Sequence, residues 1–253
     1  LKQLKFKYDI QEKRQSTAKM SFHVGETSGR KILEAQGISK NIGGKQICSK
    51  FSVSIRRGER IAMVGANGVG KTTLLNILFR DLAPDEGTIK RGTNWITASF
   101  EQNKGSLDMD ASLQENLTGD PDIALPGRSD QVLVKGVPRH VVGYLKEFLF
   151  DPSTLTAPVR SLSGGEKSRL ILAKLMAKTS NLLLLDEPTN DLDIETLDLL
   201  QELLCEFDGT ILLISHDRDF VERVATRVLF FEGNGRIIDF TGGYEAYLNN
   251  FLE

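Results

Sequence analysis

A glycine-rich segment between residues 65 and 72 carries the strongest chemical signal in the chain. It reads Gly65-Ala-Asn-Gly68-Val-Gly70-Lys71-Thr72 and fits G-x-x-x-x-G-K-[ST], in which backbone N–H groups curl around a phosphate at a helix start. The lysine supplies a cation for phosphate oxygens, and the threonine hydroxyl is a hard oxygen ligand for Mg²⁺. The segment therefore predicts a phosphate site formed by Gly65, Ala66, Asn67, Gly68, Val69, Gly70, Lys71, Thr72 and Thr73.

A second signal is the acidic pair Asp186 and Glu187, which follows four consecutive leucines. An acidic residue at the tip of a buried strand beside such a phosphate site usually holds Mg²⁺, and we expect Asp186 to do so. Alternation along the strand directs the Glu187 side chain the other way, where it can orient the water that attacks a terminal phosphate. An acidic exit from a strand is common by itself, and its coupling to the phosphate site favours the catalytic interpretation.

A third segment, Leu162-Ser163-Gly164-Gly165-Glu166, precedes a helical pattern in which Leu170, Ala173 and Ala177 share one face. Ser163 and Glu166 form an S-x-x-E capping box, which is sufficient to explain both residues as a helix start. Capping does not need two glycines, and each destabilises the first turn by about 1 kcal/mol. The glycine pair therefore favours a second use, the close approach of the backbone to an anion at the positive end of the helix.

Two of these segments follow short apolar runs. Three such runs are brief and flanked by turn or polar residues, as strands buried on both faces of a parallel sheet are: residues 60–64, 182–185 and 211–214. A helical pattern follows each of them, at residues 71–79, 194–207 and 218–225. This alternation predicts an α/β core with right-handed crossovers and with ligands at the carboxyl ends of the strands.

Other regions depart from this alternation. Residues 46–55 and 228–240, the second with a turn at Gly233-Asn-Gly235, are typical of antiparallel strands added at the edge of a sheet. Five of the seven prolines lie between residues 120 and 159. That density predicts loops around short helices, inserted between the two regular halves of the chain.

In their chain order these motifs closely resemble the ATP-binding-cassette (ABC) family. LSGGE at residues 162–166 matches the family's signature motif and lies, as in the family, after the phosphate loop and before the acidic strand. Three further positions match: Gln102 the Q-loop glutamine, Asp191 the D-loop, and His216 the switch histidine. The resemblance covers roughly residues 32–240 and implies an α/β P-loop NTPase fold with a parallel core sheet, an antiparallel edge sheet and a helical subdomain.

In that family two cassettes clamp two ATP molecules head to tail, and the P-loop of one cassette and the signature of the other enclose each nucleotide. The resemblance therefore implies ATP and Mg²⁺ as ligands, and a second ABC cassette as partner, in the same full-length chain or in a homodimer. It implies Glu187 and His216 as catalytic residues. It implies Thr72, Gln102 and Asp186 as metal ligands. Beyond the P-loop it implies Gln102 and Asp191 as contacts of the nucleotide on this cassette. Toward a partner's ATP it implies Ser163, Gly164 and Gly165.

The exact residues of the signature and of the segment after the acidic strand differ between ABC subfamilies. LSGGE-K-S-R and DEPTNDLD resemble the ABC-F group, soluble proteins with two cassettes on one chain, whereas importer and exporter cassettes more often carry LSGGQ-x-Q-R and DEPTSALD. The stretch VVGYLKEFLF before the signature most resembles the Uup branch of that group. The resemblance implies a cytoplasmic ATPase that acts on the ribosome or on a branched nucleic acid.

Two other classes of ABC protein share the same motifs. The ATP-binding subunit of a membrane transporter docks a coupling helix near the Q-loop, where the polar Glu101-Gln102-Asn103-Lys104 offers little apolar surface. ABC ATPases of DNA repair and chromosomes carry very long coiled coils between their two halves, and the 92 residues from Trp95 to Asp186 leave no room for one. The transporter subunit therefore stays as the alternative.

Composition agrees with a soluble globular protein. The chain has 253 residues, of which 40% are hydrophobic and 26% charged. No uninterrupted apolar run exceeds four residues, against the roughly 18 that a membrane span needs, so we expect no membrane insertion. Two cysteines are too few for a disulfide framework or a zinc site and are consistent with a reducing cytosol.

Charge divides the chain unevenly, with a net +5 in residues 1–31 and −7 in the remainder. A basic leader on an acidic body favours an arm that touches an anion such as nucleic acid, and a solvated helix or tail explains it equally well. The leader also resembles the linker that joins two ABC-F cassettes. We therefore expect a chain starting at Leu1 to be a second cassette with its linker. Its expected parts are a linker (1–31), an ATPase domain (32–241) and a C-terminal helix (242–253). The helical subdomain of the ATPase domain is expected at about 111–178.

One position departs from the family pattern. Many cassettes place an aromatic residue where it stacks on adenine, and this sequence has Ile42 within Lys40-Asn-Ile-Gly-Gly. We expect Ile42 to contact the base by apolar packing alone, and therefore weak binding of ATP. The preference for ATP over GTP stays open.

Overall fold

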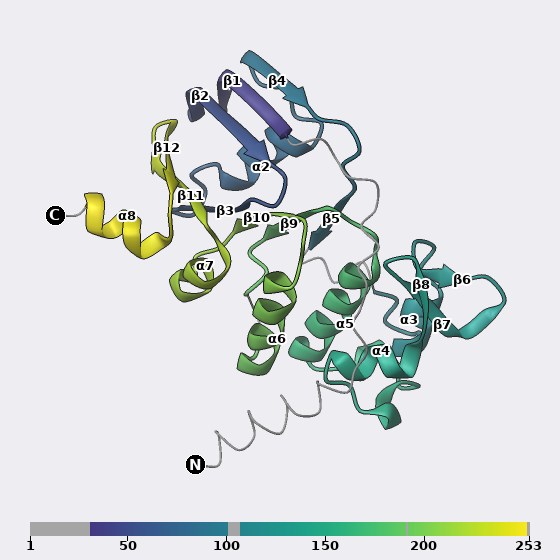
Figure 1. Cartoon of the computed structure of the whole chain (residues 1–253). Coiled ribbons are helices and arrows are strands. Elements are labelled where there is room, and N and C mark those ends of the chain that lie inside the picture. Colours follow the sequence, from purple (N-terminus) through teal and green to yellow (C-terminus); the bar gives the residue numbers. More distant parts are fainter. Residues whose placement is uncertain (1–30, 101–106, 191, 252–253) are drawn as a thin grey trace.

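The centre of the computed structural model, which describes residues 31–100, 107–190 and 192–251, is a six-stranded sheet. Its strand order is β12-β11-β3-β10-β9-β5, and all neighbouring pairs are parallel except β11 with β12 (Figure 1). The strands are β3 (Arg60–Gly65), β5 (Thr97–Phe100), β9 (Leu182–Asp186), β10 (Thr210–Ile214), β11 (Arg227–Gly233) and β12 (Arg236–Thr241).

Helices follow three of these strands, as the sequence predicts. They are α2 (Lys71–Phe79) after β3, α6 (Ile194–Cys205) after β9 and α7 (Arg218–Val224) after β10. The predicted bounds of all six elements are confirmed to within two residues. The leucines of β9 and the apolar residues of β10 are buried on both faces, which explains why these strands read as continuous apolar runs rather than as alternating ones.

Helix α2 is buried between the core sheet and a second, antiparallel sheet. Its residues Leu74, Ile77 and Leu78 are fully buried in one cluster with apolar side chains of both sheets. At its end, the ring of Phe79 lies 5.3 Å from the ring of Trp95, centroid to centroid. The helix is therefore packed along its length, and its first residue, Lys71, follows the predicted phosphate loop directly.

The second sheet has the order β2-β1-β4 and consists of β1 (Lys31–Ile42), β2 (Lys45–Arg56) and β4 (Glu86–Arg91). The strand predicted at residues 46–55 is confirmed as antiparallel, although it belongs to this separate sheet rather than to the edge of the core sheet. Glycines 43 and 44 form the turn of the β1–β2 hairpin with φ values of +57° and +80°. Such a turn fits glycine, which has no Cβ to clash.

The prediction for residues 228–240 is half wrong. β12 is antiparallel to β11, joined by the predicted turn at Gly233–Gly235, but β11 itself runs parallel to β3 and is a full member of the core sheet. The sequence showed the local hairpin. It could not show the pairing of β11 with β3, which lies more than 160 residues earlier in the chain and depends on tertiary packing.

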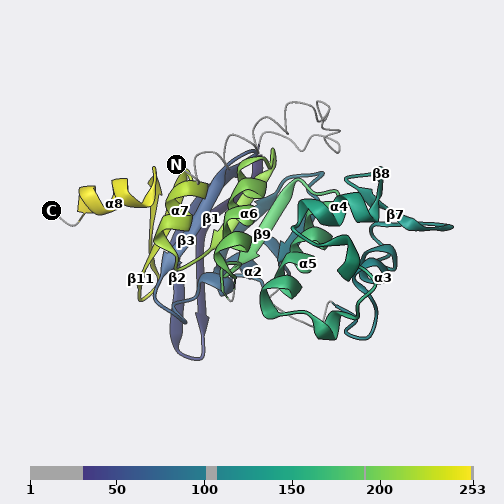
Figure 2. The same ribbon diagram turned by 90° about the horizontal axis from the view of Figure 1, so that it is seen from below.

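The region from residue 107 to 178 packs at one side of the core sheet and contains helices α3 (Leu113–Thr118), α4 (Val141–Glu147) and α5 (Gly164–Ala177) (Figure 2). Two short 3₁₀ turns lie at Pro152–Thr154 and Val159–Ser161. The prediction of loops around short helices between residues 120 and 159 is incomplete. An antiparallel sheet β6-β7-β8 also forms there, from Ala124–Leu125, Arg128–Val134 and Val137–His140.

The hairpin of β7 and β8 had a signal in the sequence that the proline count obscured. Lys135 and Gly136 form its two-residue turn with φ values of +50° and +80°, between the paired residues Val134 and Val137. Positive φ at both central positions is the pattern of a type I′ turn. The Lys135 N–H donates to Ala177 O at 2.7 Å, which joins the hairpin to the end of α5.

The last helix, α8 (Tyr244–Phe251), is held on the core sheet by aromatic rings. Tyr247 stacks on Phe230 of β11 with 3.5 Å between ring centroids and meets Phe240 of β12 edge-on at 5.7 Å.

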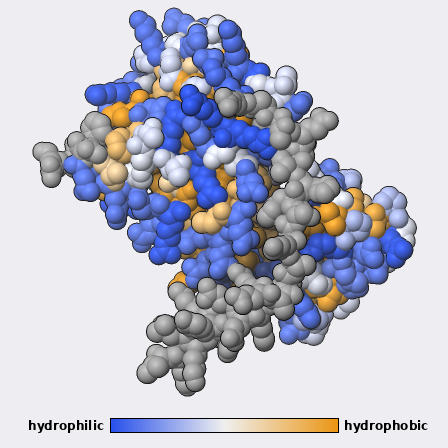
Figure 3. All heavy atoms as spheres, viewed as in Figure 1, coloured by the Kyte–Doolittle hydropathy of each residue, from blue (hydrophilic) through white to orange (hydrophobic). Residues whose placement is uncertain are grey.

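Within the described part of the chain, no helix has both the length and the apolar character to cross a membrane. The face in Figure 3 is largely hydrophilic, with apolar areas scattered rather than joined into one patch.

Candidate functional site

The loop between β3 and α2 has a backbone shape that glycine adopts most easily. Gly65, Gly68 and Gly70 have φ values of +156°, +72° and +118°. A Cβ at Gly65 would lie 2.8 Å from Phe231 of β11. A Cβ at Gly70 would lie 2.8 Å from the Ile47 side chain of β2. Packing and conformation therefore both require glycine here, and they hold the loop close to both sheets.

Helix α2 begins directly after this loop, and its own first turn carries no acidic side chain. Gly70 is the N-cap residue, it offers no side-chain cap, and the first turn holds no acidic residue. The unpaired N–H groups and the positive end of the helix dipole therefore favour an anion from outside. This geometry fits the phosphate site predicted for residues 65–73.

Lys71 is the buried cation of this site, with 6% of its surface exposed. Its Nζ donates to the backbone oxygens of Gly65 at 2.8 Å and Ala66 at 3.0 Å, and it lies 3.1 Å from Nε2 of His216. Burial lowers the pKa of Lys71, and the neighbouring carboxylate of Glu187 opposes that change. The ammonium is thus held inside the loop, where phosphate oxygens can replace its present partners.

Thr72 joins the start of α2 to the end of β9. Its Oγ1 donates a hydrogen bond of 2.7 Å to Oδ2 of Asp186. Among the residues described, no group of three or more His, Cys, Asp or Glu side chains is placed to hold a metal. The hydroxyl and the carboxylate oxygen of this pair are hard ligands and fit an ion of the Mg²⁺ type, which takes one or two protein ligands together with waters and phosphate oxygens.

The backbone of Glu187 is held in the left-handed region. β9 ends at Asp186, and Glu187 has a φ of +48°. Strand alternation therefore does not set the direction of its side chain, contrary to the expectation from the sequence. Its N–H donates to Ile214 O at the end of β10, at 2.9 Å. Such a conformation costs about 1–3 kcal/mol in a residue other than glycine and is concentrated at functional sites.

The carboxylate of Glu187 lies 3.0 Å from Nε2 of His216. Burial raises the pKa of Glu187, and the charges of His216 and Lys71 oppose the rise. The same Nε2 atom lies 3.1 Å from Lys71 Nζ. One ring nitrogen can donate to a carboxylate or accept from an ammonium, but not both. The three side chains therefore form a set whose hydrogen bonds can be redistributed when a ligand arrives.

The loop that carries His216 is fixed from both sides. Ser215 is fully buried, and its Oγ accepts from the N–H of Asp217 at 3.1 Å and lies 3.4 Å from Oγ1 of Thr189. Asp217 caps α7 by accepting from the N–H of Phe220 at 3.0 Å. These contacts place the histidine at the end of β10 while leaving its ring exposed to solvent.

Helix α5 begins with the predicted capping box. Ser163 Oγ accepts from the N–H of Glu166 at 3.2 Å, and the Glu166 carboxylate accepts from the N–H of Ser163 at 2.8 Å. The two glycines differ, because a Cβ at Gly165 would overlap the carboxylate of Asp193, whereas one at Gly164 would have no atom within 4 Å. Packing within the chain thus explains Gly165, while the backbone at Gly164 can be approached from outside.

The structure brings part of the predicted site together. Five predicted residues converge at the carboxyl ends of β3, β9 and β10: Lys71, Thr72, Asp186, Glu187 and His216. The hydrogen bonds of Ser163 instead stay within the start of α5. Gln102 and Asp191 lie outside the described residues.

The β1–β2 hairpin adds a contact that no sequence motif indicates. Nζ of Lys45 donates to the backbone oxygen of Gly68 in the phosphate loop at 2.6 Å. Ile42, on the other strand of the hairpin and paired with Lys45, has 45% of its surface exposed. A lysine beside a Gly-Gly turn is unremarkable in sequence, and only the fold places it over the loop.

Comparison with known proteins gives the chain a family context. The family model described as ABC transporter matches residues 48–190. The chain is 47% identical to the ATP-binding protein Uup of Escherichia coli over 228 residues, covering 90% of this chain and 35% of that protein. It is 44% identical to the Uup protein of Caulobacter vibrioides over 238 residues, covering 94% and 38% respectively.

A more distant relative is the energy-dependent translational throttle protein EttA of Haemophilus influenzae, 36% identical over 236 residues, with 93% of this chain and 41% of that protein covered. The chain thus spans about a third to two fifths of the length of these three relatives. Among solved structures, the chain superposes on cbiO1 of Clostridium perfringens with a TM-score of 0.67 at 24% sequence identity. The superposition covers 88% of this chain and 93% of cbiO1, which is part of an ABC transporter complex. That likeness supports the predicted fold class.

Proposed function

The chain belongs to the ATP-binding-cassette family, with the Uup proteins among its relatives, and we propose that it is the ATP-binding and ATP-hydrolysing cassette of a soluble ABC-F protein. The substrate is ATP with Mg²⁺, and the products are ADP and phosphate. The relatives share sequence over nearly all of this chain.

The convergence of Lys71, Asp186, Glu187 and His216 at one edge of the sheet is the observation that carries the proposal. A phosphate chain bound by the loop N–H groups places its terminal phosphate beside Lys71. The start of α2 and the end of β9 then meet it from two sides. This is the arrangement that in-line attack by water requires.

Each side chain has a role that its surroundings support. Lys71 exchanges its bonds to loop carbonyls for phosphate oxygens and neutralises charge on the terminal phosphate. Thr72 and Asp186 hold Mg²⁺, which supplies further charge neutralisation when bound. Glu187 orients and polarises the attacking water, while His216, 3.0 Å from it, steadies the carboxylate and senses the terminal phosphate.

A second cassette completes the site in this proposal. The backbone at Gly164 faces open space at the positive end of α5, which suits an anion brought by another molecule. Ser163, Gly164 and Gly165 would therefore cap the terminal phosphate of a partner's ATP, and Gln102 and Asp191 would complete the two-cassette site. A single cassette then hydrolyses ATP feebly, and turnover rises with protein concentration or with an added second cassette.

The target is proposed to be the ribosome or a branched nucleic acid in the cytoplasm. The name of the EttA relative refers to translation, and the basic residues 1–31 carry a net +5 that suits a polyanion. We interpret these residues as a linker between two cassettes, residues 32–241 as the cassette with a mainly helical subdomain at about 111–178, and residues 242–253 as a following helix.

ATP hydrolysis by the purified chain tests the reaction. We expect slow Mg²⁺-dependent release of phosphate, lost in Glu187→Gln and retained in Lys90→Met, whose side chain is exposed on β4. Fast turnover per molecule that is independent of protein concentration contradicts the two-cassette proposal.

Co-purification tests the target. Co-purifying ribosomes or nucleic acid support the proposed target, and a co-purifying partner with membrane spans favours a transporter subunit instead.

A further inference from the structure

The order of elements along the sheet fixes the direction in which a bound nucleotide runs. β10 and β9, which carry His216, Asp186 and Glu187, lie on one side of β3. On the other side lies β11, whose turn to β12 contacts β2: Ser49 donates from its N–H to Gly235 O at 3.0 Å. The terminal phosphate belongs with the catalytic carboxylate. The other end of the phosphate chain must therefore leave toward the β1–β2 hairpin.

This hairpin is held firmly enough to present a side chain at a defined place. Lys40 forms an ion pair of 2.7 Å with Asp85, and the N–H of Asn41 donates to the same carboxylate at 2.8 Å. Further along, Ile47 packs against Gly70 of the phosphate loop so closely that no Cβ fits there. Lys45 therefore reaches the loop from a hairpin that is anchored on both of its strands.

Lys45 has an exposed side chain, and none of the ion pairs found among the described residues involves it. Within the described part of the chain its ammonium bonds to Gly68 O alone, at 2.6 Å. This bond joins two exposed residues and stabilises the fold little, because water serves either group as well. An ammonium has three N–H donors, so at least two stay available at the rim of a loop that binds phosphates.

We propose that Lys45 is a nucleotide-binding residue whose ammonium pairs with the α-phosphate, at the opposite end of the phosphate chain from Lys71. This inference rests on the proposed binding of ATP and deepens it. Lys71 serves the terminal phosphates from inside the loop, and Lys45 serves the first phosphate from the hairpin. ADP gains from Lys45 as much as ATP does, because both carry an α-phosphate, whereas pyrophosphate fills only the inner positions.

Binding of ATP, ADP and pyrophosphate to wild type and Lys45→Met, measured by calorimetry with Mg²⁺, tests the inference. We expect Lys45→Met to weaken ATP and ADP alike by about five- to thirty-fold, the size of one charge-assisted contact. Pyrophosphate should bind within about two-fold of wild type. Lys45→Arg should restore most of the affinity, and Lys90→Met, the same change on exposed β4, should have no effect.

Two results overturn the inference while leaving the proposed function intact. One is unchanged affinity of Lys45→Met for ATP and ADP. The other is an equal loss for pyrophosphate, which means that Lys45 only shapes the loop through Gly68. A wild-type chain that binds pyrophosphate but neither nucleotide contradicts the proposed function itself. Thermal unfolding of each variant verifies that the fold is retained, as we expect for an exposed side chain.

Discussion

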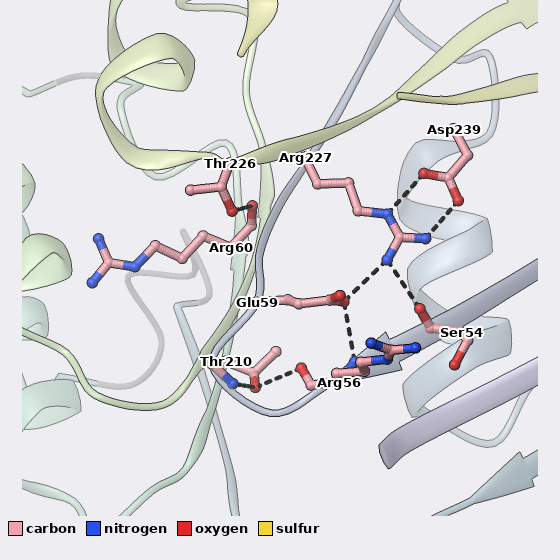
Figure 4. A network of polar contacts seen from close by, with 9 residues as sticks. Ser54, Arg56, Glu59, Arg60, Thr210, Thr226, Arg227 and Asp239 are labelled. Atoms are coloured by element: carbon pink, nitrogen blue, oxygen red, sulfur yellow. Dashed lines mark hydrogen bonds and ion pairs between the residues drawn. The ribbon is translucent and has the colours of Figure 1, made fainter. Parts of the chain in front are cut away.

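The two ends of the core sheet use charged side chains in opposite ways. At the amino ends of β3, β10 and β11, Arg227 is a cation paired with two carboxylates: it makes two bonds to Asp239, of 2.7 and 2.5 Å, and one each to Glu59 and Ser54 O, of 3.0 Å (Figure 4). These bonds raise the pKa of Arg227, first through Asp239. At the carboxyl ends of the same strands, Lys71 has neutral partners and a lowered pKa.

The two ends differ in whether their charged groups have fixed partners within the chain. Around Arg227, carboxylates and a carbonyl satisfy the guanidinium in a rigid arrangement, and the loop before β3 is closed further by the bond from Gly58 N to Oγ1 of Thr210, at 2.9 Å. Around Lys71, one histidine nitrogen lies within hydrogen-bond distance of two neighbours and can bond only one of them, and Glu187 has a strained backbone. One end stabilises the fold, and the other keeps its charges available for a ligand.

Glu187→Gln gives the largest expected effect at the carboxyl end. Replacing the carboxylate by an amide removes the group that polarises water, so we expect the rate of ATP hydrolysis to fall by about 10²- to 10³-fold. ATP affinity and the unfolding temperature should change little, because the side chain keeps its size. Release of phosphate and equilibrium binding measure the two effects. Turnover near that of wild type would show that another group acts on the water.

Lys71→Ala separates binding from stability. The loss of the buried cation should weaken ATP binding by about 10²-fold, since charge-assisted bonds to phosphate disappear. The free energy of unfolding should stay the same or rise, because burial disfavours the Lys71 ammonium more than the nearby carboxylates of Glu187 and Asp186 favour it. Chemical denaturation and nucleotide titration test this together. A large loss of stability would break the contrast between the two ends.

Arg227→Met should have the reverse pattern. It leaves the carboxylates of Asp239 and Glu59 without their partner in a partly buried place, and we expect the free energy of unfolding to fall by about 2–4 kcal/mol. The ATP affinity of the folded fraction should stay within about two-fold of wild type. Arg236→Met, at an exposed ion pair with Glu232, serves as the matched control and should cost less than about 1 kcal/mol.

Ile42→Tyr is expected to have the smallest effect, and it tests whether the base of ATP lies against the β1–β2 hairpin. A ring at this exposed position can stack on the base, and we expect ATP affinity to rise about three- to ten-fold, the size of one aromatic contact. Binding of pyrophosphate should not change, since it carries no base. Unchanged ATP affinity would mean that the base does not lie against Ile42.

The elements that the sequence predicted well are those whose signals are local. β3 and α2 frame a motif whose glycines, lysine and threonine each have a local backbone or chemical reason. The buried strands β9 and β10 were recognised because both faces are apolar. The capping box of Ser163 and Glu166 is local as well, and the structure confirms it.

The parts that the sequence did not reveal depend on distant neighbours or on a single turn. The parallel pairing of β11 with β3 is non-local, and the direction of the Glu187 side chain depends on a left-handed residue held by β10. The hairpin at Lys135 and Gly136 was present as a two-residue turn but was outweighed by the surrounding prolines. Lys45 has no motif, and only the packing of two sheets places it over the P-loop.

The contact between Phe79 and Trp95 gives this molecule a built-in optical reporter. Trp95 is the only tryptophan in the sequence, and its ring lies 5.3 Å from the ring at the end of α2. That helix is nine residues long and starts at Lys71. A rigid helix that shifts when phosphate binds at its first turn must move Phe79 against the indole. The intrinsic fluorescence of the unlabelled chain should therefore follow nucleotide binding in real time.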